Sequence, residues 1–200
     1  MGTSKALLEW HGSTLVRHTV DLVARSVDGP VVVVRSPGQE LGGLPDATWV
    51  VDDTRPGAGP LAALATGLDA LDGHADRVFT CGVDTPFVTP AFVAVLMEAL
   101  ADGVDIALPT ADGRRQPLPA AVRVAVAATA HALVDDGHRA LFALVERCRS
   151  RDVVEDVLRA ADPSLASLRN LNDRASYEAA LAEAAPRPTI EGDGHGVTRS

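Results

Sequence analysis

Carboxylates and glycines follow two apolar runs of the sequence, and these residue types suit the binding of a phosphorylated ligand. Asp52 and Asp53 come directly after "TWVV" and lead into "TRPGAGPL", where Gly57 and Gly59 let the backbone approach a ligand without a Cβ in the way. Asp84 follows the run "VFTC" in the stretch "GVDTPF". This spacing predicts that the groups stand just past strand ends, where they can meet a phosphate or a cation.

Oxygen ligands for a divalent cation are available from Asp84 and from a late segment, "LRNLND", which supplies Asn170, Asn172 and Asp173. Magnesium takes one or two carboxylates together with phosphate and water oxygens. We therefore predict a Mg²⁺ site with Asp84 as its main protein ligand, and Lys5 as the side chain that meets the phosphates. Each residue alone is typical of a turn, a cap or a solvated surface. The prediction depends on their shared position at strand ends.

The composition narrows the class of protein. The 200 residues are 46% hydrophobic and 22% charged, as in one α/β domain large enough to bury a core. A formal net charge of -9 argues against a nucleic-acid partner, since phosphate neutralisation needs a basic face. No apolar run reaches the roughly 20 residues of a membrane helix. The two cysteines form neither a CxxC motif nor a Cys/His cluster. We expect a cytoplasmic protein that acts on small molecules, without membrane contact.

Alternating strands and helices must position these groups. Strands are predicted in "PVVVVRS", "ATWVVDD", "RVFTC" and "VDIALP". Helices are predicted in "STLVRHTVDLVARSV", "GPLAALATGLDAL", "AFVAVLMEALADG" and, after "PLPAAVR", from about Val124. This order predicts a three-layer α/β fold with a mostly parallel sheet and helices on both faces. Ligands of such sheets bind at the carboxyl ends of the strands. Residues 1–185 are expected to form one domain, and the Pro-, Gly- and charge-rich residues 186–200 a disordered tail.

Five stretches, taken in order, resemble one family. "MGTSKALLEWHGSTL", "VVDDTRPGAGPLAAL", "CGVDTPFVTP", "RRQPLPAAV" and "NLND" are similar to the NTP-transferase family that contains the molybdenum cofactor guanylyltransferases, over residues 1–184. The specific pieces are "GxGPL" after a strand-end Asp and "DTPF" after the next strand. The resemblance implies a Rossmann-like nucleotidyltransferase fold. It also implies GTP or another NTP with Mg²⁺ as cosubstrates, and molybdopterin or another phosphorylated small molecule as acceptor.

The resemblance also implies roles for individual residues. Lys5 and Asp84 would be catalytic, with Lys5 on the nucleotide phosphates and Asp84 on Mg²⁺. The implied nucleotide-binding residues are Lys5, Asp52, Gly57, Gly59, Pro60 and Leu61. The implied acceptor-binding residues are Gln116, Pro117, Arg139, Asn170 and Asn172.

The chain departs from the family pattern in three places. Ser4 precedes Lys5 where the family often has Asp, and "NLND" stands where the family usually continues with Thr-Pro. The family opens with a strand and a glycine-rich loop of the form "LAGGxSxRMG", whereas this chain begins at the Met-Gly of that motif. We therefore expect an upstream strand and loop. A chain without the loop is expected to bind nucleotide weakly, because the loop's backbone N–H donors are lost.

Two alternatives stay open from the sequence. One keeps the fold and changes the substrates, giving a molybdopterin cytidylyltransferase or a nucleotidyltransferase for another phosphorylated acceptor. The other is a non-catalytic scaffold protein that retains the fold and has lost its nucleotide loop.

Overall fold

The computed structural model describes residues 4–101 and 103–184 of the chain. The predicted tail, residues 186–200, and the domain boundary at 185 lie outside the described residues.

The α-helices are α1 (Leu15–Ala24), α2 (Pro60–Ala70), α3 (Pro90–Ala99), α4 (Ala127–Asp135), α5 (Leu141–Arg147), α6 (Glu155–Ala161) and α7 (Arg174–Glu183). Three 3₁₀ segments are η1 (Lys5–Leu7), η2 (Val124–Val126) and η3 (Ala166–Leu168). No helix in these ranges is long and apolar enough to cross a membrane.

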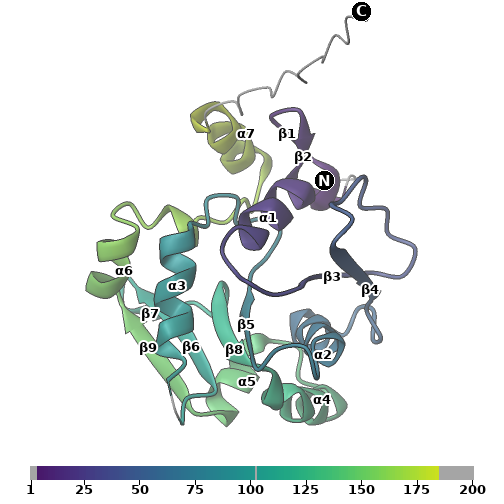
Figure 1. The fold of residues 1–200 in the computed structure, drawn as a ribbon, viewed down its shortest axis with the longest axis vertical. Helices are drawn as coiled ribbons and strands as arrows, with labels where there is room; N and C mark the ends of the chain where they lie inside the picture. The colour runs from purple at the N-terminus through teal and green to yellow at the C-terminus, as the bar shows by residue number, and fades with distance from the viewer. Residues whose placement is uncertain (1–3, 102, 185–200) are drawn as a thin grey trace, which may run out of the picture.

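The strands form separate sheets (Figure 1). They are β1 (Glu9–Trp10), β2 (Ser13–Thr14), β3 (Val31–Arg35), β4 (Thr48–Asp52), β5 (Arg77–Thr80), β6 (Ile106–Ala111), β7 (Arg114–Arg115), β8 (Ala120–Arg123) and β9 (Ser150–Val154). The hairpin β1–β2 is antiparallel and the pair β3–β4 is parallel. The five-stranded sheet has the order β5-β8-β6-β7, with β9 pairing β6.

Helix starts follow the local sequence. Thr14 caps α1, since its hydroxyl accepts a hydrogen bond from the backbone N–H of Arg17 at 3.3 Å. Thr89 caps α3 in the same way. Helices α2 and α3 both begin with proline, whose fixed φ suits the first helical turn. The helices predicted at these places are confirmed, as are the strands β3, β4, β5 and β6.

Helices lie on both faces of the five-stranded sheet. Successive side chains of β6 point to opposite faces, so Ile106 and Leu108 pack in a core with α2, α4 and α5. Ala107 packs in a second core with Phe92 of α3 and Leu158 of α6. The sheet is therefore buried from both sides, which leaves the strand ends as the places where polar groups can meet a ligand.

The sequence predicts a mostly parallel sheet, and this prediction is wrong. Strand β8 runs antiparallel to both β5 and β6. Among the described residues, parallel pairing is limited to β3–β4 and β6–β9. The reason is the connection between β6 and β8. A parallel crossover needs a dozen or more residues, usually a helix. Here the chain instead reverses through Asp112 and Gly113, with φ of 50° and 68°, into the short antiparallel strand β7.

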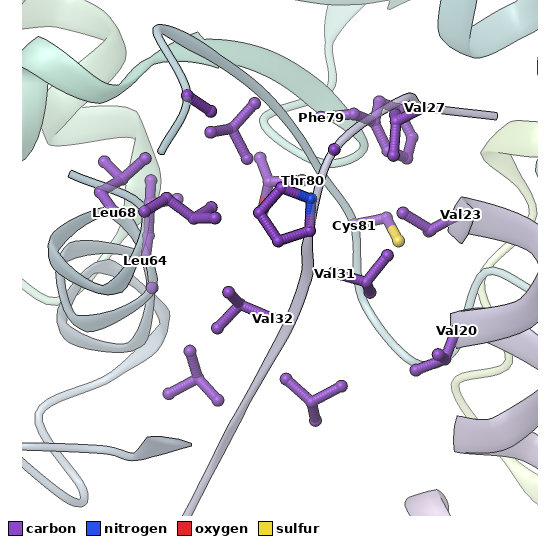
Figure 2. A pocket seen from close by; sticks show the side chains of 18 of the residues that line it. Val20, Val23, Val27, Val31, Val32, Leu64, Leu68, Phe79, Thr80 and Cys81 are labelled. Atoms are coloured by element: carbon purple, nitrogen blue, oxygen red, sulfur yellow. The ribbon is translucent and has the colours of Figure 1, made fainter. Parts of the chain in front are cut away.

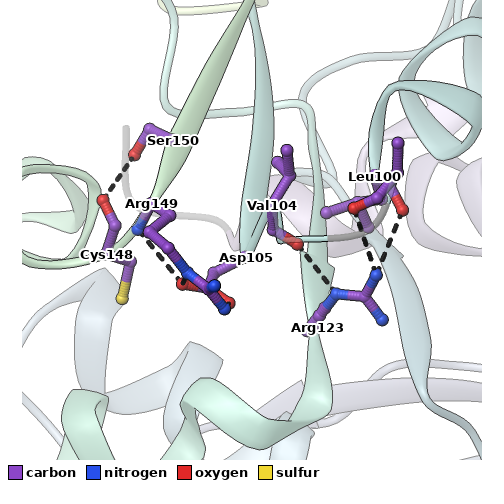
Figure 3. A network of polar contacts seen from close by, with 8 residues as sticks. Leu100, Val104, Asp105, Arg123, Cys148, Arg149 and Ser150 are labelled. Atoms are coloured by element: carbon purple, nitrogen blue, oxygen red, sulfur yellow. Dashed lines mark hydrogen bonds and ion pairs between the residues drawn. The ribbon is translucent and has the colours of Figure 1, made fainter.

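Charged side chains fix the amino ends of β6 and β9, as Figure 3 shows. Asp105 accepts hydrogen bonds from Nε, Nη2 and the backbone N–H of Arg149, at 3.0, 2.8 and 3.1 Å. On the neighbouring strand, Arg123 donates to the carbonyls of Val104, Leu100 and Ala101. These bonds hold the register of the sheet at the edge where β6 and β9 begin and the antiparallel strand β8 ends.

We expect Asp105→Asn to lower the melting temperature most at neutral pH. The hydrogen bonds from Arg149 hold the pKa of Asp105 below its usual value. The stability from this ionised group is therefore present above its unfolded-state pKa, and is lost as the pH falls through the lower folded-state pKa. Thermal melts at pH 7 and in the acid range below about pH 4 should show a smaller difference from wild type in acid.

The matched control is Asp46→Asn, which changes an exposed loop carboxylate. It should melt like the wild type across this range. An Asp105→Asn deficit of the same size at both pH values contradicts the assignment.

Candidate active site

The carboxyl ends of β3 and β4 lie at one edge of the molecule and are joined by side chains. In the parallel register Arg35 stands opposite Asp52, and its Nε donates to Oδ1 of Asp52 at 2.7 Å. Nη1 of Arg35 also donates to the backbone carbonyl of Gln39 at 3.1 Å. The side-chain amide of Gln39 in turn donates to the hydroxyl of Ser4 at 2.9 Å. The residue before Lys5 is thereby anchored at the end of β3.

Lys5 meets Asp84 at the end of β5. Their Nζ and Oδ2 atoms are 3.1 Å apart, with both side chains about a quarter to a third exposed. The turn after β5 positions the carboxylate, since the hydroxyl of Thr85 donates to the carbonyl of Gly82 at 2.7 Å. A Cβ on Gly82 would lie 2.4 Å from Oδ1 of Asp84, so the carboxylate occupies space that only glycine leaves. The structure brings the two predicted catalytic residues into direct contact.

The late Asn-x-Asn segment lies against the same turn. The backbone N–H of Leu171 donates to the carbonyl of Asp84 at 2.9 Å, and the Leu171 side chain is buried with Trp10. Burial of Leu171 leaves its neighbours Asn170 and Asn172 exposed on either side. These two predicted acceptor residues therefore lie beside Asp84.

Asp173, and not Asn172, caps helix α7. Its carboxylate accepts from the backbone N–H of Ser176 at 2.7 Å, in a reciprocal capping box. The hydrogen bonds from Ser176 hold the pKa of Asp173 below its usual value, and the positive charge of Lys5 adds to this effect. Asp173 is thus a second carboxylate within electrostatic reach of Lys5.

The glycine loop packs against Arg139. Gly57 and Gly59 have φ of +81° and +94°, the left-handed region that favours glycine. The carbonyl of Arg139 accepts from the backbone N–H of Leu61 at 3.2 Å, and its guanidinium donates to the carbonyl of Gly57. Pro60 begins α2, while the Leu61 side chain is fully buried. Arg139 therefore lies with the predicted nucleotide loop, and Leu61 turns its side chain into the core.

Gln116 lies against β6, and Pro117 follows it on the way to β8. The backbone N–H of Gln116 donates to the carbonyl of Pro109 at 2.8 Å. In the antiparallel register of β8 and β5, Ala120 stands opposite Thr80. The segment before Ala120 thus runs beside the carboxyl end of β5, on the edge that carries Asp84.

The donor set around Asp84 fits a magnesium ion that is completed by substrate phosphates. No cluster of three or more His, Cys, Asp or Glu that could hold a metal occurs in residues 4–101 and 103–184. Magnesium needs only one or two carboxylates when phosphate and water oxygens fill its other positions. Asp84, with the exposed amides beside it, meets that requirement.

Sequence reasoning missed the side chains that tie the two sides of this edge together, namely Ser4, Arg35 and Gln39. Arg35 carries a usable signal, because it ends its apolar run as Asp52 ends the neighbouring one. Ser4 and Gln39 carry no such signal in the sequence, because neither of them ends an apolar run and their hydrogen bond joins two segments outside the strands.

Cys81 directly follows β5, just before the turn that holds Asp84. Burial is the main cause that raises its pKa to about 11. A hydrogen bond with Thr85 opposes the rise, and the negative charge of Asp84 adds to it. Cys81 and Cys148 are both free cysteines. Because Asp84 acts on its titration, the Cys81 thiol reports on the charge at the candidate site.

Comparisons with known proteins agree on the family. The model of the MobA-like NTP transferase domain matches residues 1–163. A probable molybdenum cofactor guanylyltransferase of Mycobacterium tuberculosis (strain ATCC 25618 / H37Rv) is 35% identical over 185 residues, which cover 90% of this chain and 87% of that protein.

Two solved structures share the fold. Molybdopterin-guanine dinucleotide biosynthesis protein A of Archaeoglobus fulgidus has a TM-score of 0.76 at 22% identity, covering 90% of each chain. The 2-C-methyl-D-erythritol 4-phosphate cytidylyltransferase of Thermus thermophilus has a TM-score of 0.67 at 23% identity, covering 90% of this chain and 93% of that one.

Alanine at the two loop glycines should separate backbone strain from steric clash. A Cβ on Gly59 would lie 2.9 Å from Cβ and from the carbonyl oxygen of Arg139, whereas a Cβ on Gly57 meets nothing within 4 Å. We expect Gly57→Ala to cost about 1–2 kcal/mol of unfolding free energy, from the left-handed backbone alone. Gly59→Ala should cost clearly more in urea unfolding. Equal costs would mean that the contact with Arg139 does not constrain the loop.

Asp84→Asn should lower the pKa of Cys81, because it removes a negative charge that raises this pKa. In a Cys148→Ser background, the rate of alkylation by iodoacetamide should therefore rise at each pH between about 8 and 10. Asp52→Asn, at the end of another strand, serves as the control and should leave the profile unchanged. Superimposable profiles for Asp84→Asn and wild type would refute the coupling.

Proposed function

The chain belongs to the MobA-like NTP transferase family and is a nucleotidyltransferase, and we propose that it transfers GMP from GTP to molybdopterin in molybdenum cofactor biosynthesis. The observation that carries the proposal is the contact of Lys5 with Asp84 beside the Asn170 and Asn172 segment. A cation, a carboxylate and exposed amides thus stand together at the carboxyl ends of the strands. This is the arrangement that a phosphate-bearing donor and a phosphate-bearing acceptor require.

The reaction needs positioning and charge neutralisation more than covalent chemistry. A terminal phosphate oxygen of the acceptor forms a bond to the α-phosphorus of the nucleotide, and the bond from that phosphorus to the leaving pyrophosphate breaks. The attacking phosphate oxygen is already ionised, so no general base is needed. Such reactions depend on groups fixed in place before the charge develops. The short turn that holds Asp84 and the anchored start of the chain that holds Lys5 provide such fixed groups.

Lys5 neutralises phosphate charge in this scheme. Its ammonium has three N–H donors, and the contact with Asp84 uses one of them. The remaining donors are available to phosphate oxygens. A Mg²⁺ ion held by Asp84, with phosphate oxygens among its ligands, would supply further neutralisation at the reacting phosphate.

The nucleotide is assigned to the side of Asp52 and the Gly57–Leu61 loop. Gly57 and Asp52 are exposed, and the backbone at Gly57 has open space around it. Because the N–H of Leu61 already donates to Arg139, the loop would offer its glycine backbone rather than Leu61. Arg139 contacts this loop, so its assigned role toward the acceptor requires that the acceptor reach the loop as well.

The acceptor is assigned to the side of Gln116, Pro117, Asn170 and Asn172. The exposed or half-buried side-chain amides of Gln116, Asn170 and Asn172 can hydrogen-bond a polar heterocycle or its phosphate. The net charge of -9 favours small anionic substrates held by a few placed groups over a nucleic acid. Two free thiols support a reducing compartment such as the cytoplasm.

A cytidylyltransferase is the second candidate. The observation in its favour is the similarity of the fold to the cytidylyltransferase of Thermus thermophilus. Titration calorimetry with GTP and CTP separates the two, because the proposed function requires tighter binding of GTP. A chain that binds neither nucleotide would favour the scaffold alternative.

Asp84→Asn should reduce turnover by at least ~100-fold, the scale of losing one preorganised electrostatic contact. The measurement is pyrophosphate release from GTP with molybdopterin across a Mg²⁺ titration. The fold should be retained, because Asp84 is a partly exposed residue at a strand end.

Asp46→Asn is the matched control and should turn over at the wild-type rate. A thermal melt of each variant shows that the fold is intact. If Asp84→Asn turns over at nearly the wild-type rate with an unchanged Mg²⁺ requirement, Asp84 is only a turn residue.

A further inference from the structure

A tight turn follows β3. Residues 36–39 read "SPGQ", with proline at the second position and glycine at the third. The backbone N–H of Gln39 donates to the carbonyl of Ser36 at 2.9 Å, and Gly38 has a φ of +76°. These are the features of a type II turn, whose third position favours glycine. The sequence of this turn therefore suits one backbone conformation.

The side chain of Gln39 has a defined orientation in this turn. Its Oε1 accepts from the backbone N–H of Ser36 at 3.1 Å. Because a backbone N–H can only donate, the amide oxygen must lie on that side and the amide nitrogen on the other. The amide nitrogen donates to the hydroxyl of Ser4 at 2.9 Å. Reversing the amide would lose the bond to Ser36, so the turn holds Ser4 from a fixed direction.

Arg35 connects this turn to the end of β4. Its Nη1 donates to the carbonyl of Gln39 at 3.1 Å, and its Nε donates to Oδ1 of Asp52 at 2.7 Å. The planar guanidinium holds its N–H donors in a fixed geometry. One side chain therefore orients both the carboxylate of Asp52 and the turn that holds Ser4.

The strand β3 gives Arg35 a fixed base. Val31 packs toward the core that contains α1, whereas Val32 packs toward the core that contains α2. Figure 2 shows these two side chains on opposite sides of β3, around an apolar cavity of about 780 Å³. At the end of the strand, the carbonyl of Arg35 accepts from the backbone N–H of Asp53 at 2.7 Å. The backbone of Arg35 is thus held at the carboxyl ends of β3 and β4.

These contacts form one path between two carboxylates of the candidate site. Its members, in order, are Asp52, Arg35, Gln39, Ser4, Lys5 and Asp84. The contacts between side chains or with the turn are 2.7 to 3.1 Å long, and the chain itself joins Ser4 to Lys5. A displacement of the Arg35 guanidinium would therefore be transmitted along the path to the ammonium of Lys5.

We propose that Arg35 is a positioning residue that couples Asp52, on the nucleotide side, to Lys5. Gln39 and Ser4 are the intermediate links. The inference rests on the proposed function, in which Asp52 faces the nucleotide and Lys5 neutralises its phosphates. Arg35 itself touches neither substrate in this scheme. It holds the carboxylate and, through the turn, the lysine in one geometry, so that both meet the same nucleotide.

Kinetic constants of three variants test the order of the path. Gln39→Leu and Ser4→Ala each remove the same hydrogen bond and leave the ion pair of Arg35 with Asp52 intact. The kcat for pyrophosphate release should fall about two- to tenfold, the effect of one hydrogen bond, at an unchanged KM for GTP. Arg35→Met should lower kcat and also raise the KM for GTP, because it releases both Asp52 and the turn.

Two further variants separate positioning from a general loss of structure. Because Gln39→Leu and Ser4→Ala remove one shared bond, the double variant should have the kcat of either single variant. Ser4→Thr keeps the hydroxyl and should restore the kcat. Thermal melts establish that each variant is folded at the assay temperature. Ser4→Ala removes only one hydroxyl, so it keeps the test valid if Gln39→Leu does not fold.

Lys5 is the only lysine in the sequence, which provides a readout without turnover. In uniformly ¹⁵N-labelled protein its ammonium gives the one lysine side-chain signal. Asp84→Asn should shift this signal, because it weakens the ion pair. Arg35→Met, Gln39→Leu and Ser4→Ala should shift the signal toward the same position, although the path from Arg35 to Lys5 passes through two other residues.

The matched control is Arg77→Met, which changes an exposed arginine at the start of β5. It should leave kcat, the KM for GTP and the Lys5 signal unchanged. A Lys5 signal that keeps its wild-type position in Arg35→Met would overturn the inference, as would additive losses of kcat in the double variant. If the Lys5 signal shifts as expected but the wild-type protein releases no pyrophosphate from GTP, the positioning of Lys5 stands and the proposed function fails.

Discussion

The ion pair between Lys5 and Asp84 is the contact on which the candidate site depends. It joins residues 79 positions apart and draws the start of the chain onto the end of β5. A partly exposed ion pair adds little stability by itself, so its importance is positional. It works together with the hydrogen bond between Gln39 and Ser4, which holds the neighbouring residue at the end of β3. Together the two contacts join the ends of β3 and β5 through adjacent residues of the chain.

The backbone around the site is more constrained than its side chains. Asp84 is held by a turn closed through Thr85, and its own carbonyl accepts from Leu171, a buried residue of a distant segment. The functional groups nearby, such as Asn170 and Asn172, remain exposed. A rigid backbone with exposed polar groups suits a reaction in which the protein orients two charged substrates.

Much of the fold could be predicted from local sequence, because its signals are local. Apolar runs gave β3, β4 and β5, and Thr14 marked the start of α1. The direction of β8 could not be obtained in this way. It depends on the reversal at Asp112–Gly113 and on pairing between strands far apart in the chain. Strand β9, with its polar sequence "SRDVV", lacks the apolar run that marked the other strands.

The site shows the same division between local and distant signals. Strand-end position pointed to Asp84, which follows β5, and the structure places this residue in contact with Lys5. The place of Arg139 against the glycine loop could not be inferred, because it depends on how α2 packs against the start of α5. Side chains that bridge two loops leave no periodic pattern in a sequence.

The contacts between the two ends of the described chain complete the burial of Trp10 late in synthesis. The phenolic hydroxyl of Tyr177 in α7 donates to the carbonyl of Glu9, across 168 residues, and Trp10 and Leu171 share one small core. While the ribosome is still making the middle of the chain, the indole of Trp10 has no such cover. The burial of Trp10 in the hairpin β1–β2 is therefore completed only after α7 has been made. During that interval a nascent chain exposes a hydrophobic surface that chaperones recognise.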